Sequence, residues 1–245
     1  MIFLRSLTYN VLFYVNLIVW LICAIPTFVL PPRYLMAMAQ GWAKSALWLL
    51  KVICNTSYEV RGMEKLPAGG YIMAGKHQSF WETFALLTLV KNPVFILKRE
   101  LMWIPLFGWC LAKTSMIPID RGAKTKALAM AMGRAKEEVS GNGRQLIIFP
   151  EGTRRPAGAE PSYKFGIAHI YADLGVPCVP VALNTGLYWP RRKFLRYPGT
   201  ILVEILDPIP AGLDKQVFFE RMQASIEEGS NRLLAEGRRQ LGRTG

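Results

Sequence analysis

The feature that most restricts the fold is the alternation of short apolar runs with helix-like segments after Asn55. Runs rich in branched and aromatic residues predict β-strands at Ser57–Arg61, Tyr71–Gly75, Pro93–Leu97, Ser115–Ile119, Gln145–Phe149, Pro177–Ala182 and Thr200–Ile205. Helical spacing occurs at Ser79–Val90, Lys124–Ser140 and Gly166–Leu174, and from Asp214 to about Gly237. This order predicts an α/β fold with a mostly parallel sheet flanked by helices.

The residues before this region predict a membrane-associating hairpin of two helices. Ser6 to Pro32 contains no charged residue, and about 20 apolar residues are enough to cross a bilayer. The stretch is too long for the apolar part of a signal peptide, and no Ala-x-Ala cleavage site closes it. Pro26 and the pair Pro31-Pro32 are expected to break the helix near its end. Whether this helix crosses the bilayer or only enters it stays open.

The second helix of the hairpin is expected at Arg33 to Ile53. Its polar residues fall in one stripe about 40° wide, formed by Arg33, Gln40, Lys44 and Lys51. This pattern is typical of a helix in a membrane interface, although a core helix with one solvated stripe produces it too. We therefore expect two parts, an N-terminal membrane segment at 1–55 and an α/β domain at 56–245.

Composition restricts the class of partner. The 245 residues include 30 Lys and Arg against 17 Asp and Glu, a net charge of +13, so the surface favours anionic partners. Hydrophobic residues make up 51% of the chain and Trp occurs seven times, which argues against a nucleic-acid module. Anionic membrane lipids or an acidic carrier protein fit better. Four scattered cysteines and two histidines argue against a metal site and indicate buried thiols in a reducing compartment.

Side chains suited to catalysis follow three of the expected strands. His77 comes shortly after Gly75, the pair Asp120-Arg121 comes after Ile119, and the segment Pro150–Arg154 comes after Phe149. Ligands of parallel sheets bind outside the carboxyl ends of the strands. We therefore expect these three groups to meet at one edge of the sheet.

The first group suggests a general base with an orienting acid. His77 and Glu82 are five positions apart, about 140° on a regular helix, so they can meet only if His77 lies in the preceding turn. Glu82 would then hold the imidazole in one tautomer. A second reading is structural, since Ser79-x-x-Glu82 is a capping box in which Glu82 serves the helix start. The two roles are compatible.

Four segments in order resemble the motifs of the glycerolipid acyltransferases, the His-x4-Asp enzymes. They are His77-Gln78-Ser79 with Glu82, Ser115 to Arg121, Phe149 to Arg154, and Val176 to Val181. The resemblance covers roughly residues 56–210 and implies that family's fold. It implies that His77 deprotonates an acceptor hydroxyl and that Glu82 orients His77. It also implies a phosphate and glycerol site made of Arg121, Glu151, Gly152, Thr153 and Arg154.

The resemblance also implies a reaction. An acyl chain would pass from acyl carrier protein or acyl-CoA to the sn-2 hydroxyl of 1-acylglycerol-3-phosphate (lysophosphatidic acid), giving phosphatidic acid without a further cofactor. The site would face the cytoplasm at the cell inner membrane. One alternative acceptor is another lysophospholipid, a lyso-ornithine lipid or glycerol 3-phosphate. Another alternative is a basic membrane-binding protein without catalysis.

The chain departs from the family pattern at two positions. Glu82 stands where the family usually has Asp, and Lys76 stands where Asn is common. Lys76 is expected either to add positive potential to the phosphate site or to be exposed. The second histidine, His169, lies in an expected helix between Ala168 and Ile170 and is interpreted as structural.

The segment from Tyr188 to Tyr197 alternates aromatic and basic residues. Aromatic rings favour the headgroup level of a membrane, and basic residues favour its anionic surface. A membrane or donor contact is therefore expected here, with the candidates Trp189, Arg191, Arg192 and Lys193. A solvated basic turn is the alternative.

Overall fold

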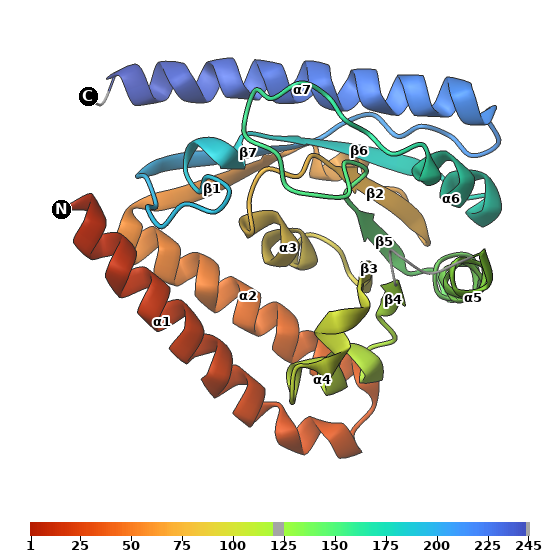
Figure 1. Ribbon diagram of the computed structural model, residues 1–245, viewed down its shortest axis with the longest axis horizontal. Coiled ribbons are helices and arrows are strands. Elements are labelled where there is room, and N and C mark those ends of the chain that lie inside the picture. The colour runs from red at the N-terminus through yellow and green to blue at the C-terminus, as the bar shows by residue number, and fades with distance from the viewer. Residues whose placement is uncertain (120–124, 244–245) are drawn as a thin grey trace.

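A twisted sheet forms the centre of the molecule (Figure 1). The computed structural model describes residues 1–119 and 125–243, and their strands follow the order β1-β7-β6-β2-β5-β3-β4. The strands are β1 Thr56–Arg61, β2 Tyr71–Gly75, β3 Pro93–Lys98, β4 Ile117–Ile119, β5 Gln145–Ile148, β6 Cys178–Leu183 and β7 Gly199–Ile205. Neighbouring strands run parallel, except that β6 and β7 are antiparallel. The predicted strands and the mostly parallel sheet are confirmed.

Helices cover both faces of the sheet. They are α1 Ile2–Cys23, α2 Pro32–Cys54, α3 Trp81–Ala85, α4 Phe107–Lys113, α5 Thr125–Lys136, α6 Gly166–Leu174 and α7 Lys215–Arg243. In Figure 1 α7 lies along one face, and α1 to α4 lie on the other. The α6 bounds are those expected, whereas α3 is shorter than expected and continues as the 3₁₀ turn η3, Leu86–Thr88. Helix α4 was not predicted, because its 7 residues are too few to show an apolar stripe at helical spacing.

The central strands explain why the sequence pattern was readable. Every residue of β2 and β6 is buried, because helices cover both faces of the sheet at these strands. Such strands appear as continuous apolar runs. Their carboxyl ends lead into the segments that contain His77 and Thr185, so the sheet brings these residues to one edge.

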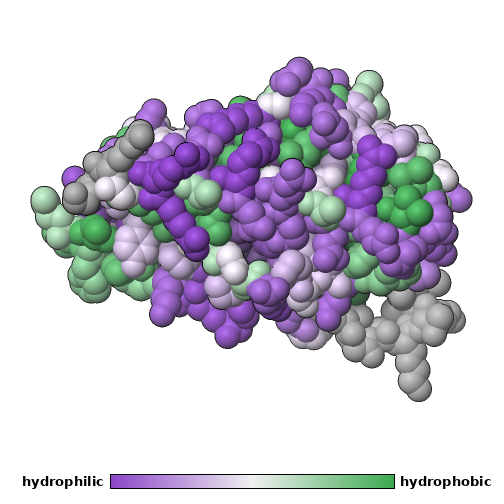
Figure 2. Space-filling model, turned by 90° about the horizontal axis from the view of Figure 1, so that it is seen from above, coloured by the Kyte–Doolittle hydropathy of each residue, from purple (hydrophilic) through white to green (hydrophobic). Residues whose placement is uncertain are grey.

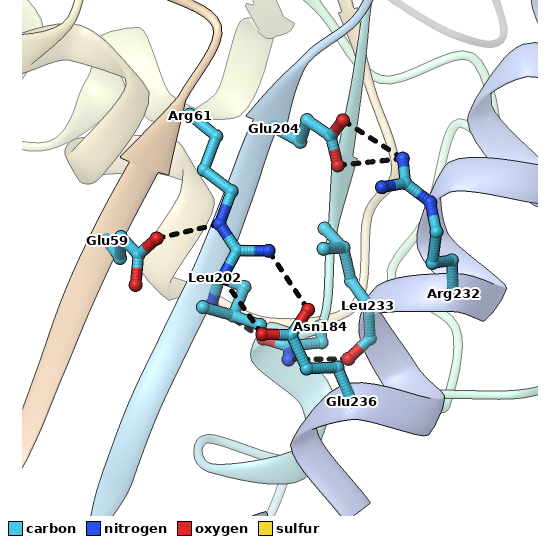
Figure 3. Close-up of polar contacts among 8 residues, drawn as sticks. All are labelled: Glu59, Arg61, Asn184, Leu202, Glu204, Arg232, Leu233 and Glu236. Atoms are coloured by element: carbon cyan, nitrogen blue, oxygen red, sulfur yellow. Dashed lines mark hydrogen bonds and ion pairs between the residues drawn. The ribbon is translucent and has the colours of Figure 1, made fainter.

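Polar contacts fix α7 on the sheet (Figure 3). Arg61 of β1 donates two hydrogen bonds of 2.9 Å to the Glu236 carboxylate. Arg232 binds Glu204 of β7 at 2.9 Å. Asn184, which follows β6, bonds to the main chain of both β7 and α7. The outer surface of the molecule on the side of α7 is mainly hydrophilic (Figure 2).

The N-terminal hairpin shares its core with the sheet domain. Tyr9 and Phe13 of α1 are buried and pack with Phe84 and Trp189 of the body. The rest of α1 exposes many apolar side chains, among them Leu4 (66%) and Val11 (54%). In the described chain, one helical segment is long and apolar enough to cross a membrane, Ile2–Val29, which includes the 3₁₀ turn η1 (Ile25–Val29). This apolar helix indicates association with a membrane.

Candidate functional site

His77 lies in the turn between β2 and α3, the position that a contact with Glu82 requires. Its Nδ1 atom is 3.7 Å from Glu82 Oε2, a charge-pair distance rather than a hydrogen bond. Nδ1 is buried and has no hydrogen-bond partner among the described residues. The imidazole stacks on Phe149 of the third motif, with ring centroids 4.1 Å apart and planes 13° apart. The ring is therefore held on one face by Phe149 and on its Nδ1 side by a carboxylate.

Glu82 is completely buried and its carboxylate is well supplied with donors. It accepts the backbone N–H groups of Gln78 (3.0 Å) and Ser79 (2.9 Å), and the hydroxyl of Thr185. The Ser79 contact is one half of a capping box, but the Ser79 hydroxyl accepts the N–H of Trp81 (3.2 Å) instead of completing that box. Glu82 therefore fixes the turn and faces His77 at the same time.

The third motif holds the main chain of His77. Glu151 Oε2 accepts the His77 N–H at 2.7 Å, and the Arg155 N–H donates to the His77 carbonyl at 2.8 Å. The Glu151 side chain is buried, and this burial raises its pKa, whereas the His77 N–H and the Lys76 charge act in the opposite direction. Gly152 follows with φ +67°, a left-handed conformation that glycine adopts without strain.

The phosphate-binding candidates are more open than Glu151. Thr153 is exposed and Arg154 is half-buried. The Arg154 guanidinium lies 5.8 Å from the centroid of the Phe80 ring, and it forms no ion pair with a carboxylate of the described ranges. Arg121 falls at 120–124 and lies outside the described residues.

An apolar cavity of about 240 Å³ adjoins His77. Side chains from β3, β4, β5 and α6 line it, among them Ile96, Leu97, Ile119, Ile148 and Ile167. The segment after β5 contributes Phe149, Pro150, Gly152 and Lys164. An apolar chain in this cavity would place its end beside the imidazole.

Of the two alternatives that the sequence offered for Lys76, exposure to solvent is wrong. Its side chain is 3% exposed and forms an ion pair with Glu227 of α7. Its Nζ atom also lies 4.0 Å from Glu151 Oε1. Strand β2 ends at Gly75, which pairs with Val181 of β6. The next side chain, Lys76, reaches Glu227 of α7 instead of solvent.

The expectation for Trp189 as a membrane or donor contact is corrected by the structure. Its indole is 6% exposed and packs on Tyr9 and Phe84, because the hairpin covers it. The buried Arg196 guanidinium lies 4.1 Å from the centroid of the Trp189 rings and also binds three carbonyls of its own loop. The aromatic and basic pattern of this loop is thus partly a core pattern.

The other basic residues of this loop remain accessible. Arg192 and Lys193 are exposed and Arg191 is half-buried. Together they line a second cavity, of about 490 Å³, with Pro156, Ala157, Gly186, Leu187 and Pro190. The Gly186 N–H donates to the Gln78 side chain at 3.0 Å, which connects the wall of this cavity to the residue after His77.

Some contacts of the site have no local sequence signal. Thr185 reaches Glu82 from a position 103 residues downstream, and Glu227 reaches Lys76 across 151 residues. His169, by contrast, is exposed beside Lys215, with 3.2 Å between its Nδ1 and the Lys215 Nζ. Within the described ranges, no three His, Cys, Asp or Glu side chains are grouped as ligands for a metal ion.

The chain resembles known proteins over much of its length. Residues 57–184 match the family model described as Acyltransferase. A 1-acyl-sn-glycerol-3-phosphate acyltransferase of Pseudomonas aeruginosa is 40% identical over 168 residues, 69% of this chain. That match spans 65% of the relative, slightly less than two thirds of its length. The enzyme of the same name from Escherichia coli is 30% identical over 73% of this chain and 71% of its own.

The fold has a solved counterpart. The crystal structure of the 1-acyl-sn-glycerophosphate acyltransferase PlsC of Thermotoga maritima superposes with a TM-score of 0.79. It covers 95% of this chain and 98% of its own, at 24% identity. The family match contains His77, Glu82, Glu151 and Arg154, and it extends over more than half of the chain. The chain therefore belongs to the acyltransferase family.

Proposed function

We propose that this protein transfers an acyl group from a thioester to the sn-2 hydroxyl of 1-acylglycerol-3-phosphate, giving phosphatidic acid. The observation that carries this proposal is the position of His77. Its Nδ1 faces the buried Glu82 carboxylate, and its ring forms part of the wall of an apolar cavity. A base beside a site for an apolar chain suits acyl transfer, and the names of the relatives support this acceptor.

The proposed reaction uses His77 as base and then as acid. Glu82 favours the tautomer with the proton on Nδ1, so Nε2 is free to accept the proton of the acceptor hydroxyl. The hydroxyl oxygen then bonds to the thioester carbonyl carbon. As the tetrahedral intermediate collapses, the C–S bond breaks and the imidazolium returns its proton to the thiolate. The separation of 3.7 Å is expected to shorten with substrate bound, as such pairs often do.

Acceptor recognition is assigned to the segment after β5. The Arg154 guanidinium is half-buried and free of carboxylate partners in the described chain, so it is suited to a bidentate phosphate contact. Arg121 is proposed as a second phosphate contact, and Gly152 and Thr153 as neighbours of the glycerol. Since the Glu151 carboxylate binds the His77 N–H, Glu151 supports the base in this proposal.

The donor is proposed to approach the cavity beside Arg191, Arg192 and Lys193. In the described chain these three cations form no ion pair, and they line a hollow of about 490 Å³ next to Gly186. Acyl-CoA and acyl carrier protein both carry negative charge that such a surface attracts. The surface around the site is proposed to contact anionic lipids. We propose that the active site lies at the cytoplasmic face of the inner membrane and that the reaction needs no cofactor beyond the donor.

The test is acyl transfer by the full-length protein in detergent, with both donor types and several lyso-acceptors. His77→Ala should lower turnover by roughly 10²–10⁴, the usual contribution of a general base. His169→Ala is the matched control and should retain activity, because His169 is exposed on α6 and does not line the cavity beside His77. Near-normal turnover in a folded His77→Ala protein would contradict the mechanism. Preference for a different lyso-acceptor would change the proposed substrate but not the proposed mechanism.

A further inference from the structure

A buried group of charges lies directly behind the site, between the His77 turn and α7. Lys76 is 3% exposed in its side chain, Glu151 is 1% and Glu227 is 16%. Lys76 Nζ pairs with Glu227 Oε1, and the Tyr163 hydroxyl donates to the same oxygen at 2.7 Å. Burying three charges is costly unless each has a partner. Their presence next to the base therefore calls for an explanation.

The group connects to His77 through Glu151. One Glu151 oxygen accepts the His77 N–H at 2.7 Å. The other oxygen is buried, has no hydrogen-bond partner among the described residues, and lies 4.0 Å from Lys76 Nζ. Lys76 is thus the cation that compensates the free side of the carboxylate. The contacts form a continuous chain from α7 to the base, in the order Glu227, Lys76, Glu151, His77.

We propose that Lys76 and Glu227 are positioning residues for His77, acting through Glu151 on the backbone of the catalytic turn. The proposal rests on the acyl-transfer function proposed above. Lys76 holds Glu151 in the ionised form that binds the His77 N–H, and Glu227 keeps the Lys76 ammonium at the distance that leaves Glu151 on His77. Without Glu227, the ammonium would move onto Glu151 and compete with the His77 N–H.

The charges suggest a specific pattern of mutational effects. The group carries one positive and two negative charges, a total of −1. Lys76→Gln changes this total to −2, Glu227→Gln changes it to zero, and the double variant restores −1. Since the double variant removes both members of the pair and leaves Glu151 on His77, it should recover part of what each single change loses. A residue that merely fills space would not show this recovery.

The experiment compares kinetics of the full-length protein and the three variants in detergent. Lys76→Gln should lower kcat about 10–100-fold, the cost of a small misplacement of a catalytic group, and change the KM for either substrate little. The double variant should have a kcat clearly above that of Lys76→Gln. Glu228→Gln, which removes an exposed charge from the adjacent position on α7, is the matched control and should behave like the unchanged protein.

The pH profile gives a second readout. The groups that face Glu151 are Lys76 and His77 from the turn, Tyr163 from the segment before α6, and Glu227 from α7. Since the Lys76 charge lowers the pKa of Glu151 and burial raises it, Lys76→Gln should move the acidic limb of the kcat profile to higher pH. The double variant should move it back, because the Glu227 charge that also raises this pKa is gone.

A third readout does not depend on activity. Diethyl pyrocarbonate modifies neutral imidazoles, and in a His169→Ala background His77 is the sole histidine of the chain. Lys76→Gln should speed this modification by loosening the turn, and the double variant should slow it again. Equal kcat in Lys76→Gln and the double variant, or an effect confined to KM, would overturn the pair. Absence of acyl transfer by the unchanged protein would instead end the proposed function, and the modification rates would still test the pair.

Discussion

Single residues at this site serve both the fold and the chemistry. Glu82 anchors the turn through two backbone N–H groups and the Thr185 hydroxyl, and it also faces His77 Nδ1. An amide in its place can still accept those hydrogen bonds, but it carries no charge to stabilise an imidazolium. The structural and the electrostatic contributions of Glu82 are therefore separable by one substitution.

Glu82→Gln should retain the melting temperature of the unchanged protein and lose most activity. The amide oxygen keeps the contacts to Gln78 and Ser79, whereas loss of the orienting charge in comparable systems lowers kcat by up to about 10⁴. Thermal unfolding and kcat of the same preparation check both parts. Thr185→Val is a useful comparison, since it removes one hydrogen bond and keeps the charge. A destabilised Glu82→Gln protein with full activity per folded molecule would show that Glu82 only caps the turn.

Arg154→Lys should raise the KM for a phosphorylated acceptor more than the KM for the donor. Lysine keeps the charge but cannot copy the planar, two-pronged contact of a guanidinium with phosphate. Arg155→Lys is the matched control on the neighbouring position, because Arg155 contacts His77 through its backbone N–H, which the substitution retains. An equal rise in KM for an acceptor without phosphate would assign Arg154 another role.

At the scale of elements, α7 covers one face of the sheet (Figure 1). Its apolar side faces β6 and β7, with Phe218, Met222, Ile226 and Leu233 fully buried. Two carboxylates with lowered pKa values stabilise it, Asp214 just before its first turn and Glu236 on the side that faces β1. Backbone N–H groups at the helix start lower the pKa of Asp214, and the Arg61 hydrogen bond lowers that of Glu236.

These lowered pKa values predict that α7 docking weakens in acid. A carboxylate with a folded-state pKa below its unfolded value stabilises the fold above the unfolded pKa, and loses this effect as pH falls through the folded pKa. Glu236→Gln should therefore lower stability by about 0.5–1 kcal/mol at pH 7, and the difference should shrink as pH falls below about 4.3, the ordinary pKa of Glu, toward the lowered pKa of the folded state. Thermal unfolding from pH 7 to pH 3 checks this, with Glu228→Gln as control. A difference as large at pH 3 as at pH 7 would show that charge is not the cause.

The elements differ in how far the sequence reveals them. β2 and β6 were predictable because strands buried on both faces are apolar throughout. The approach of His77 to Glu82 was predictable because it is local and depends on one turn. The Lys76–Glu227 pair was not, since it joins a turn to a helix 151 residues away and depends on how α7 packs. Trp189 was misread because an aromatic residue in a basic loop resembles an interface residue until the hairpin covers it.

At the scale of the whole molecule, the hairpin and the body cannot be separated cleanly. Tyr9 and Phe13 belong to the same hydrophobic core as the sheet, so a protein lacking the hairpin would expose that core. Experiments on membrane binding should accordingly use the full chain. The contributions of the apolar outer surface of α1 and of the basic cavity beside Arg191 to membrane binding can then be compared in one folded protein.

Changing Arg191, Arg192 and Lys193 to Glu in the full chain should raise the KM for the donor, most strongly at low salt. Exposed charges act over about 10 Å at 0.1 M ionic strength and less as salt increases. The KM for the acceptor should change little. The variant should still bind anionic vesicles, because α1 is unchanged. A loss of vesicle binding with normal donor kinetics would assign the loop to lipid instead. Lys215 and Arg221, reversed together on α7, provide a control with two charge reversals outside the residues that line this cavity.

The core shared by both ends of the chain has a consequence for biosynthesis. Asn10 of α1 bonds to the carbonyl of Phe194, 184 residues later in the chain. At about 5–20 residues per second, a ribosome takes roughly 10–40 s to make that segment. Until the end of this delay Tyr9 and Phe13 lack Trp189, although Trp42 and Phe84 of the same cluster are made much earlier. The aromatic cluster around α1 is therefore completed only after most of the chain has been synthesised.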